Sequence, residues 1–593
     1  MQKLPYAIAN FLTIREENYL YIDRTAYIRA LEAMSGRSLL FVRPRRFGKS
    51  LWLNVLSRYY DVALTDRFEE LFGDLDIGRD PTPLHNRYFV MTWNFSRIDP
   101  RGTVDQIADR MNETLNSVIE EFLVYYEEFL PSAIPIKPQA INTLGNILKV
   151  LAKTPYKLYL LIDEYDNFAN EVMATDEGTY KGLVQKEGPL KTLYKGLKEL
   201  MESSVLDRIF ITGVSPVVMS DITSGANIFT NIYLDGEFNA LCGFTEQEVR
   251  QMVEDAVQTC KLEPAAVDEA MQMMETWYNG FLFSQDSTER VYNPTLVLYF
   301  LDPFSRRCTY PRQLLDSNLA ADEGKLEYLG KIVSGRQAVI DVLQTDRPLT
   351  INALSDRFTL SSMLDRLSQD TTFLASYLYY FGMLTIAGTD AQGRICLSPP
   401  NLVMKKLYAD HMLRFLLPLG TERDDATAAV DRLIVDGQVQ PLLHLVESKL
   451  FPIFSNRDYR WMNEFAVKMA LTTLLFNDVN YALFSEPELS RGYADLCLII
   501  RPDARHYQLF DMLFEFKYVS LDAVKLSGEQ VKHIDTRELL QKTPVKAAFQ
   551  DARTQLNRYA GVLQERFGEQ LRLKTYIVVS VGFERLFGEE LKR

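Results

Sequence analysis

The sequence has few of the residues that build metal centres and disulfide frameworks. Its 593 residues include five cysteines and five histidines, and no two cysteines form a C-x-x-C pair. Dispersed histidines argue against a structural zinc site, which needs closely spaced ligands. An odd, scattered set of cysteines is typical of reduced thiols in a cytosol. We therefore expect a cytoplasmic protein.

Long apolar runs and an excess of positive charge are also lacking. The longest uncharged run, between Asp370 and Asp390, contains serine, threonine, glycine and three tyrosines, so no membrane span is expected. The N-terminal stretch lacks the apolar segment of a secretory leader. A net charge of −14 argues against a protein that coats nucleic acid indiscriminately, but it leaves room for a local basic cleft.

Length and composition indicate a globular chain with several cores. Hydrophobic residues make up 47% and charged residues 24% of the chain, and no low-complexity tract or repeat is present. At roughly 100–200 residues per domain, several domains are expected. Strands that alternate with helical segments over residues 37–240 predict an α/β fold with a parallel sheet covered by helices.

A candidate phosphate-binding loop follows the first predicted strand. Residues 37–42, RSLLFV, predict a buried strand, and the residues after Lys49 have helical spacing. At such a position backbone amides can surround phosphates, Lys49 can reach the β and γ oxygens and Ser50 can ligate Mg²⁺. A general P-loop has a glycine where this chain has Arg43, so a Gly-Lys-Ser triplet in an ordinary loop is the alternative.

A second strand ends in two adjacent carboxylates. Residues 157–164, KLYLLIDE, form the apolar run, and the pattern is that of a Walker B strand. Asp163 would hold Mg²⁺ through water, and Glu164 would polarise the attacking water. A strand that ends in a solvated acidic turn is the alternative. Together with the loop, this strand favours a nucleotide site.

A third strand ends in small hydroxylated residues. In residues 208–217, RIFITGVSPV, Thr212 and Ser215 are candidates for a polar sensor of the γ-phosphate. An ordinary exit from a strand into a turn explains these residues equally well.

Several motifs in the first half of the chain resemble the bacterial predicted AAA-ATPase-like family. They are YLYIDRTAYI, RPRRFGKSL, LLIDEYDNF, ITGVSPVVMSDITSGANIFTNI, LCGFTEQEV, WYNGFLF and VYNP, spread over roughly residues 4 to 300. The arginine-rich start of the loop is the usual form in that family. The resemblance implies ATP and Mg²⁺ as cofactors. The residues it assigns to nucleotide binding are Arg43, Arg46, Gly48, Lys49, Ser50, Asp163 and Thr212.

The middle of the chain, residues 301–444, predicts a helical connector. Short helices followed by a hairpin over residues 349–388 are compatible with a winged-helix-like module. Only Arg357 and Arg366 could supply positive charge for reading DNA, so a packing or relay role is expected.

Carboxylates and a lysine converge in the C-terminal part. WMNEFAVKMALTTLLF predicts a helix that carries Glu464, GYADLCLII a strand with Asp495, and LFEFKY a strand with Glu515 and Lys517. Alternation along a strand places Glu515 and Lys517 on one face. Such a group suits Mg²⁺ and a metal-activated water. An E-x-K pair can also be a plain cross-strand ion pair.

Residues 445 to 590 resemble the PD-(D/E)XK nuclease superfamily on these motifs and on DARTQLNRYA, which places Gln555 and Tyr559 four residues apart on a helix. The resemblance implies a restriction-endonuclease-like α/β domain, with Asp495 and Glu515 as metal ligands and Lys517 as the catalytic lysine. Glu464, Gln555 and Tyr559 would be helpers. No proline precedes Asp495, unlike the superfamily signature. The stretch 541–574 is basic overall, which favours DNA as a partner.

The predicted organisation is an ATPase-like P-loop domain at 1–300, a connector at 301–444 and a nuclease-like domain at 445–593. The expected function is ATP binding, with hydrolysis, coupled to Mg²⁺-dependent cleavage of DNA, which by analogy of architecture would suit defence against foreign DNA. The alternatives are a regulatory or scaffold protein whose nuclease-like domain binds a partner, and an ATP-dependent DNA-binding regulator. A homo-oligomer is compatible with each of them.

Overall fold

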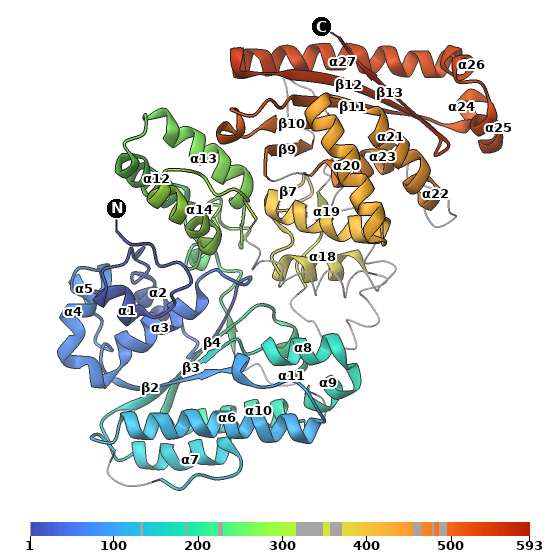
Figure 1. Ribbon diagram of the computed structural model, residues 1–593. Coiled ribbons are helices and arrows are strands. Elements are labelled where there is room, and N and C mark those ends of the chain that lie inside the picture. Colours follow the sequence, from blue (N-terminus) through green and yellow to red (C-terminus); the bar gives the residue numbers. More distant parts are fainter. Residues whose placement is uncertain are drawn as a thin grey trace.

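The computed structural model describes residues 2–130, 134–184, 188–222, 229–315, 348–355, 370–454, 464–476, 479–485 and 495–592 (Figure 1). These residues form two five-stranded sheets and one three-stranded sheet. No helix in these ranges is long and apolar enough to cross a membrane.

The N-terminal sheet is parallel, as its sequence predicts. Its strands are β1 (Ser38–Val42), β2 (Tyr88–Asn94), β3 (Lys157–Asp163), β4 (Leu206–Gly213) and β5 (Thr230–Asn231). They run in the order β2-β3-β4-β1-β5. β1 is buried along its whole length, as expected for a strand covered on both faces. β4 therefore lies between the strand that enters the loop and the strand that ends in Asp163.

Helices cover both faces of this sheet, with α3 on one side and α6, α7 and α10 on the other (Figure 1). The helices of this part are α1 (Phe11–Glu16), α2 (Tyr27–Ala33), α3 (Lys49–Tyr60), α4 (Phe68–Phe72), α5 (Asp76–Arg79), α6 (Val104–Tyr125), α7 (Ala140–Leu151), α8 (Asn167–Thr175), α9 (Glu177–Val184), α10 (Pro189–Met201), α11 (Val217–Ile222), α12 (Glu246–Cys260), α13 (Ala265–Tyr278) and α14 (Pro294–Arg307). α3 follows the loop directly. Its apolar spacing buries Trp52, Leu53 and Leu56.

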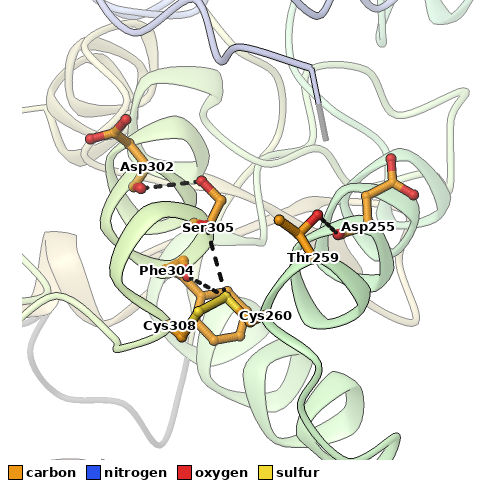
Figure 2. Close-up of a disulfide and its surroundings, with 7 residues drawn as sticks. All are labelled: Asp255, Thr259, Cys260, Asp302, Phe304, Ser305 and Cys308. Atoms are coloured by element: carbon orange, nitrogen blue, oxygen red, sulfur yellow. Dashed lines mark hydrogen bonds between the residues drawn. A yellow bond between two sulfur atoms is a disulfide. The ribbon is translucent and has the colours of Figure 1, made fainter.

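The expectation of five reduced thiols is wrong for one pair. Cys260, the last residue of α12, forms a disulfide with Cys308, the C-cap of α14 (Figure 2). The packing of α12 against α14 brings the two residues together across 48 positions of sequence. The scattered spacing of the cysteines therefore does not support a reducing compartment.

The connector contains a small antiparallel sheet and a set of helices. They are β6 (Leu349–Ile351), α18 (Thr371–Tyr380), β7 (Thr385–Thr389), β8 (Ile395–Ser398), α19 (Leu402–Leu416), α20 (Gly420–Asp436), α21 (Gln440–Leu445) and α22 (Phe451–Phe454). α18 followed by the β7–β8 hairpin agrees with the expected helix and hairpin. Arg357 and Arg366 lie outside the described residues, so the winged-helix interpretation stays a prediction. Helix α14 runs across the predicted boundary at residue 300.

The C-terminal sheet is mixed, in the order β13-β12-β11-β10-β9. Its elements are α23 (Glu464–Leu475), β9 (Tyr481–Ser485), β10 (Leu496–Ile500), β11 (Asp511–Val519), α24 (Leu521–Val524), α25 (Gly528–His533), α26 (Thr536–Gln541), α27 (Thr543–Phe567), β12 (Leu573–Val581) and β13 (Arg585–Glu590). Only the β11–β12 pair is parallel, and α27 lies on the chain between these two strands. α27 packs on the sheet face that carries Leu513, Ile577 and Val579.

Candidate functional site

Loop 43–50, which joins β1 to α3, has the backbone of a phosphate-binding turn. Gly48 has φ 91° and caps the N-terminus of α3, and Arg46 has φ 67°, which is unusual for a residue with a Cβ. The Lys49 ammonium donates to the Arg43 and Pro44 carbonyl oxygens, each at 2.9 Å. The amides at the start of α3 and the Lys49 side chain thus lie on one turn.

Asp163, at the end of β3, joins the loop to the neighbouring strand. Ser50 Oγ donates to Asp163 Oδ2 at 2.6 Å, and Thr212 Oγ1 of β4 donates to Asp163 Oδ1, also at 2.6 Å. Thr212 is fully buried and Asp163 is nearly so. The parallel strand order brings these groups together, because the carboxyl ends of β1, β4 and β3 meet at one edge of the sheet.

Glu164 lies beside this network in a left-handed backbone conformation, φ 49°. Burial and then the neighbouring Asp163 carboxylate raise the pKa of Glu164. Burial lowers the pKa of the Lys49 ammonium. A carboxylate whose pKa is raised accepts a proton more readily than an ordinary glutamate.

Asp166 holds the end of β3 against the end of β4. Its carboxylate is 1% exposed and accepts hydrogen bonds from the Val214 and Ser215 amides and from the Ser215 hydroxyl. Tyr165 completes the contact by donating to the Ser215 carbonyl oxygen at 2.5 Å. Ser215, one of the two sensor candidates, therefore has a structural partner. We had assigned no role to Asp166, although it follows Asp163 by three positions.

A cavity of about 590 Å³ opens above the loop, and we call it the loop cavity. The predicted site residues that line it are Arg46, Gly48, Lys49, Ser50 and Glu164. The apolar part of its lining comes from the N-terminal segment, from the segment before α12 and from α14, and includes Ile8, Leu20, Ile22, Phe244 and Leu298. A smaller cavity of about 290 Å³ holds Asp163 and shares Ser50 with the first. A lining that contains both charged and apolar groups suits a ligand with both characters.

Arg43 points away from this space. Its guanidinium is 2% exposed and donates to the carbonyl oxygens of Val42, Tyr233 and Phe238. The rings of Phe41 and Phe283 lie 4.4 and 4.2 Å from its Cζ. Arg43 does not line the loop cavity. Its side chain is therefore not part of the group that would contact a ligand there.

The C-terminal carboxylates converge as the alternation predicts. Asp495 stands just before β10 and accepts the Phe516 amide at 2.6 Å. Lys517 Nζ lies 2.8 Å from Glu515 Oε1. The antiparallel register that pairs Leu496 with Phe514 brings Asp495 opposite Glu515.

α27 presents a row of polar residues above this group. Gln555 donates to Asp551, whose carboxylate lies 3.4 Å from Lys517 Nζ. Tyr559 is 4% exposed, and burial and then Glu515 raise its pKa. Asp551, Gln555 and Tyr559 stand at four-residue spacing, which places them on one helix face. Asp551 is not among the site residues expected from the sequence, although it stands at this same four-residue spacing.

A second lysine also reaches the site from α23. Lys468 is 7% exposed, and its Nζ lies 3.8 Å from Asp495 Oδ1. It follows Glu464 by one helical turn, a signal that our sequence analysis did not use. Glu464 begins α23, but its side chain lies outside the described part. The described residues contain no cluster of three or more His, Cys, Asp or Glu side chains that could hold a metal ion.

Comparisons with known proteins find a family match in the N-terminal part of the chain. Residues 5–223 match the model of the family described as Predicted AAA-ATPase. An uncharacterized protein in the vnfD 5' region of Azotobacter chroococcum mcd 1 is 28% identical over 421 residues, which cover 70% of this chain and 71% of that protein.

Two solved structures show weaker similarity. A Walker-type ATPase of Pyrococcus abyssi matches with a TM-score of 0.39 and 13% identity, covering 65% of this chain and 96% of its own. The ORC1 protein of Aeropyrum pernix, in complex with DNA, matches with a TM-score of 0.24 and 12% identity, covering 66% of this chain and 92% of its own. Residues 5–223 are therefore similar to the Predicted AAA-ATPase family.

Proposed function

We propose that the loop cavity binds ATP and hydrolyses it. The observation that carries this proposal is the meeting of Ser50, Asp163 and Thr212 at one edge of the parallel sheet, directly beside Lys49. A Cβ added at Gly48 would meet no atom within 4 Å, so the loop faces open space at this point. Hydroxyl and carboxylate oxygens are the donors that Mg²⁺ prefers. The residues therefore fit a nucleotide with its metal.

Each side chain has a definite task in this proposal. Lys49 exchanges its two bonds to loop carbonyls for phosphate oxygens. Ser50 and Asp163 hold Mg²⁺, which supplies charge neutralisation when bound. Glu164, whose pKa is raised, accepts a proton from the attacking water.

We propose in addition that the C-terminal domain is a Mg²⁺-dependent DNA phosphodiesterase of the PD-(D/E)XK type. Asp495 opposite Glu515 supplies the oxygen ligands, and Lys517 holds charge that develops on phosphate. Along the chain, α23, β9, β10 and β11 are followed by the short helices α24, α25 and α26, and then by α27 and β12. The packing of α27 on β11 supports this proposal, because Asp551 of α27 lies 3.4 Å from Lys517.

One observation favours the alternative, in which this domain only holds a partner. Lys517 and Lys468 each lie against a carboxylate of the group, at 2.8 and 3.8 Å. Two internal cations can neutralise two carboxylates without metal. In that case, the site is a polar anchor of the domain and not a centre of catalysis.

Plasmid cleavage and ATP hydrolysis by the purified protein, both measured with Mg²⁺, ATP and plasmid, test the two proposals. We expect cleavage that is lost in Lys517→Ala, and ATP hydrolysis that is lost in Lys49→Ala. Lys592→Ala and Lys153→Ala are matched controls, because both lysines are exposed.

The outcomes separate the possible functions. Cleavage that is lost in Lys517→Ala but kept in Lys49→Ala would show a nuclease that works without ATP. ATP binding without cleavage under any condition would reject the nuclease proposal and favour the partner-holding alternative. Failure to bind ATP at all would reject the proposal for the loop cavity.

A further inference from the structure

Helix α14 touches the loop cavity at its first turn. Asn293 caps the helix by accepting the amides of Thr295 and Leu296. This cap holds Thr295 in place. The Thr295 hydroxyl donates to the Arg46 carbonyl oxygen at 3.0 Å. Pro294, Thr295 and Leu298 also line the loop cavity. α14 therefore contacts both the cavity and the backbone of the loop.

The bond from Thr295 falls at a strained point of the loop. Arg46 has φ 67°, and a left-handed backbone conformation is unfavourable for a residue with a Cβ. Such a conformation persists only where the surroundings hold it. A ligand that moves the loop at Arg46 would therefore move the acceptor of the Thr295 hydroxyl.

The far end of α14 is held in two ways. Cys308, its C-cap, is covalently joined to Cys260 of α12 (Figure 2). The chain then turns back, and the Tyr310 ring packs 5.3 Å from Phe300 and 4.9 Å from Phe304. Pro303 removes one backbone bond within the last turns of the helix, so these contacts stiffen the part that proline weakens.

The segment after α14 is bound by the C-terminal domain. Arg501 donates to the Pro311 carbonyl oxygen at 2.8 Å and to the Arg312 carbonyl oxygen at 3.1 Å. Its side chain is only 1% exposed, and Asp503 pairs with the same guanidinium. Arg501 directly follows β10, the strand that begins next to Asp495. Because the Arg501 guanidinium is planar and buried, its donors allow only a narrow range of positions for the two carbonyl oxygens.

We propose that α14 couples the loop cavity to the C-terminal domain. Thr295 is the positioning residue at the cavity, and Arg501 transmits the position of the helix end to β10. This inference rests on the proposed nucleotide binding, but it does not require nuclease activity. Since coupling is reciprocal, the state of the Arg501 contact also affects nucleotide affinity.

Hydrogen–deuterium exchange of the full chain, with and without a non-hydrolysable ATP analogue and Mg²⁺, tests the coupling. In the wild-type protein we expect the nucleotide to change exchange about fivefold or more at residues 308–315 and 496–505. Thr295→Val should still bind nucleotide but lose the change at 496–505. Arg501→Met should keep the change at 308–315 and lose it at 496–505.

Matched substitutions control for general effects of these changes. Thr276→Val removes a hydroxyl from a half-buried position of α13, and Arg537→Met removes an exposed guanidinium from α26. Both should respond as the wild type does. Thr295→Ser keeps the hydroxyl and should also respond fully, which a simple packing role of the threonine methyl group does not predict.

The inference is overturned if the wild type binds nucleotide without any change at 496–505, or if this change persists in both Thr295→Val and Arg501→Met. Absence of nucleotide binding in the wild type overturns the proposed function and the coupling with it. If either variant fails to fold, reduction of the Cys260–Cys308 disulfide in the wild type decides. We expect a smaller nucleotide-dependent change at 496–505 after reduction, and an unaltered change contradicts the coupling.

Discussion

Lys49 is the residue on which nucleotide affinity should depend most strongly. We expect Lys49→Met to weaken Mg²⁺–ATP binding by about 10–100-fold, because hydrogen bonds to charged groups contribute about 1.5–3 kcal/mol. The nucleotide-free protein should change little in stability, since loss of the two bonds to loop carbonyls is offset by relief of a buried charge. Isothermal titration calorimetry measures the affinity. Lys153→Met is the control, and equal affinity in both variants contradicts the assignment.

Arg43 should be a residue of stability and not of binding. Burial lowers its pKa to about 10, yet its guanidinium still bonds three carbonyl oxygens. Arg43→Met leaves buried acceptors without donors, so the free energy of unfolding should fall by about 2–5 kcal/mol. Urea unfolding measures the loss. If Arg43 instead binds phosphate, the variant will keep its stability and lose affinity for ATP.

The raised pKa of Glu164 predicts that the free energy of unfolding depends on pH. Its raised pKa means that the folded carboxyl holds its proton more tightly than the unfolded one. At pH 4, below the usual glutamate pKa of about 4.3, protonated forms predominate in both states and the group has little effect. As the pH rises, the unfolded state loses its proton first, so the native state is progressively disfavoured.

Glu164→Gln removes this effect. Its melting temperature, relative to that of the wild type, should therefore be higher at pH 8 than at pH 4. The comparison is made without nucleotide and Mg²⁺, because the charges of both would change the pKa of the Glu164 carboxyl group. A difference in melting temperature that is the same at both pH values contradicts the assignment.

At the scale of elements, the β-strand alternation correctly predicted that Glu515 and Lys517 lie on one face of β11. Glu515 and Lys517 share the face of β11 that α27 covers, whereas Phe514 and Phe516 belong to the core on the other face. A local period of two residues is enough for this prediction. It does not reveal which helices lie beside the strand, so the contacts of Asp551 and Lys468 with this group follow only from the positions of α27 and α23.

The joint between α12 and α14 should make a measurable contribution to stability. The disulfide closes a loop with a sequence separation of 48, for which reduction should lower the free energy of unfolding by about 2–4 kcal/mol. Urea unfolding with and without reductant measures this difference. Cys396→Ser should respond to reductant as the wild type does, whereas Cys260→Ser with Cys308→Ser should not respond. Equal responses from both variants would contradict the pairing.

At the scale of the whole molecule, one apolar core runs through most of the chain. It contains residues of the N-terminal sheet, of the connector and of one face of the C-terminal sheet, such as Phe41, Tyr377 and Phe514. A second core lies beneath α27. Residues that share one core tend to unfold together.

This continuity predicts how a ligand affects unfolding. Mg²⁺–ATP at about 100 times its dissociation constant stabilises the protein that binds it by about 2.7 kcal/mol. We expect one main calorimetric transition, which includes unfolding of the connector, and we expect nucleotide to raise its midpoint temperature. Two separate transitions, of which only one shifts with nucleotide, would show that the N-terminal part unfolds independently.

The sequence by itself determined the local features of this protein. The strand–loop–helix at Gly48, the acidic end of the strand at Asp163 and the shared face of Glu515 and Lys517 each depend on neighbouring residues and on the periods of strands and helices. The parallel character of the first sheet follows from buried runs that alternate with helical segments.

Only the tertiary structure decided which distant groups meet. It turned Arg43 toward carbonyl oxygens around 190 positions away, joined Cys260 to Cys308 and brought Thr295 to the loop. Such partners are chosen by packing of whole elements, through burial of apolar faces that many sequences share. No local pattern encodes them, and the link from the loop cavity through α14 to β10 therefore became visible only in the folded chain.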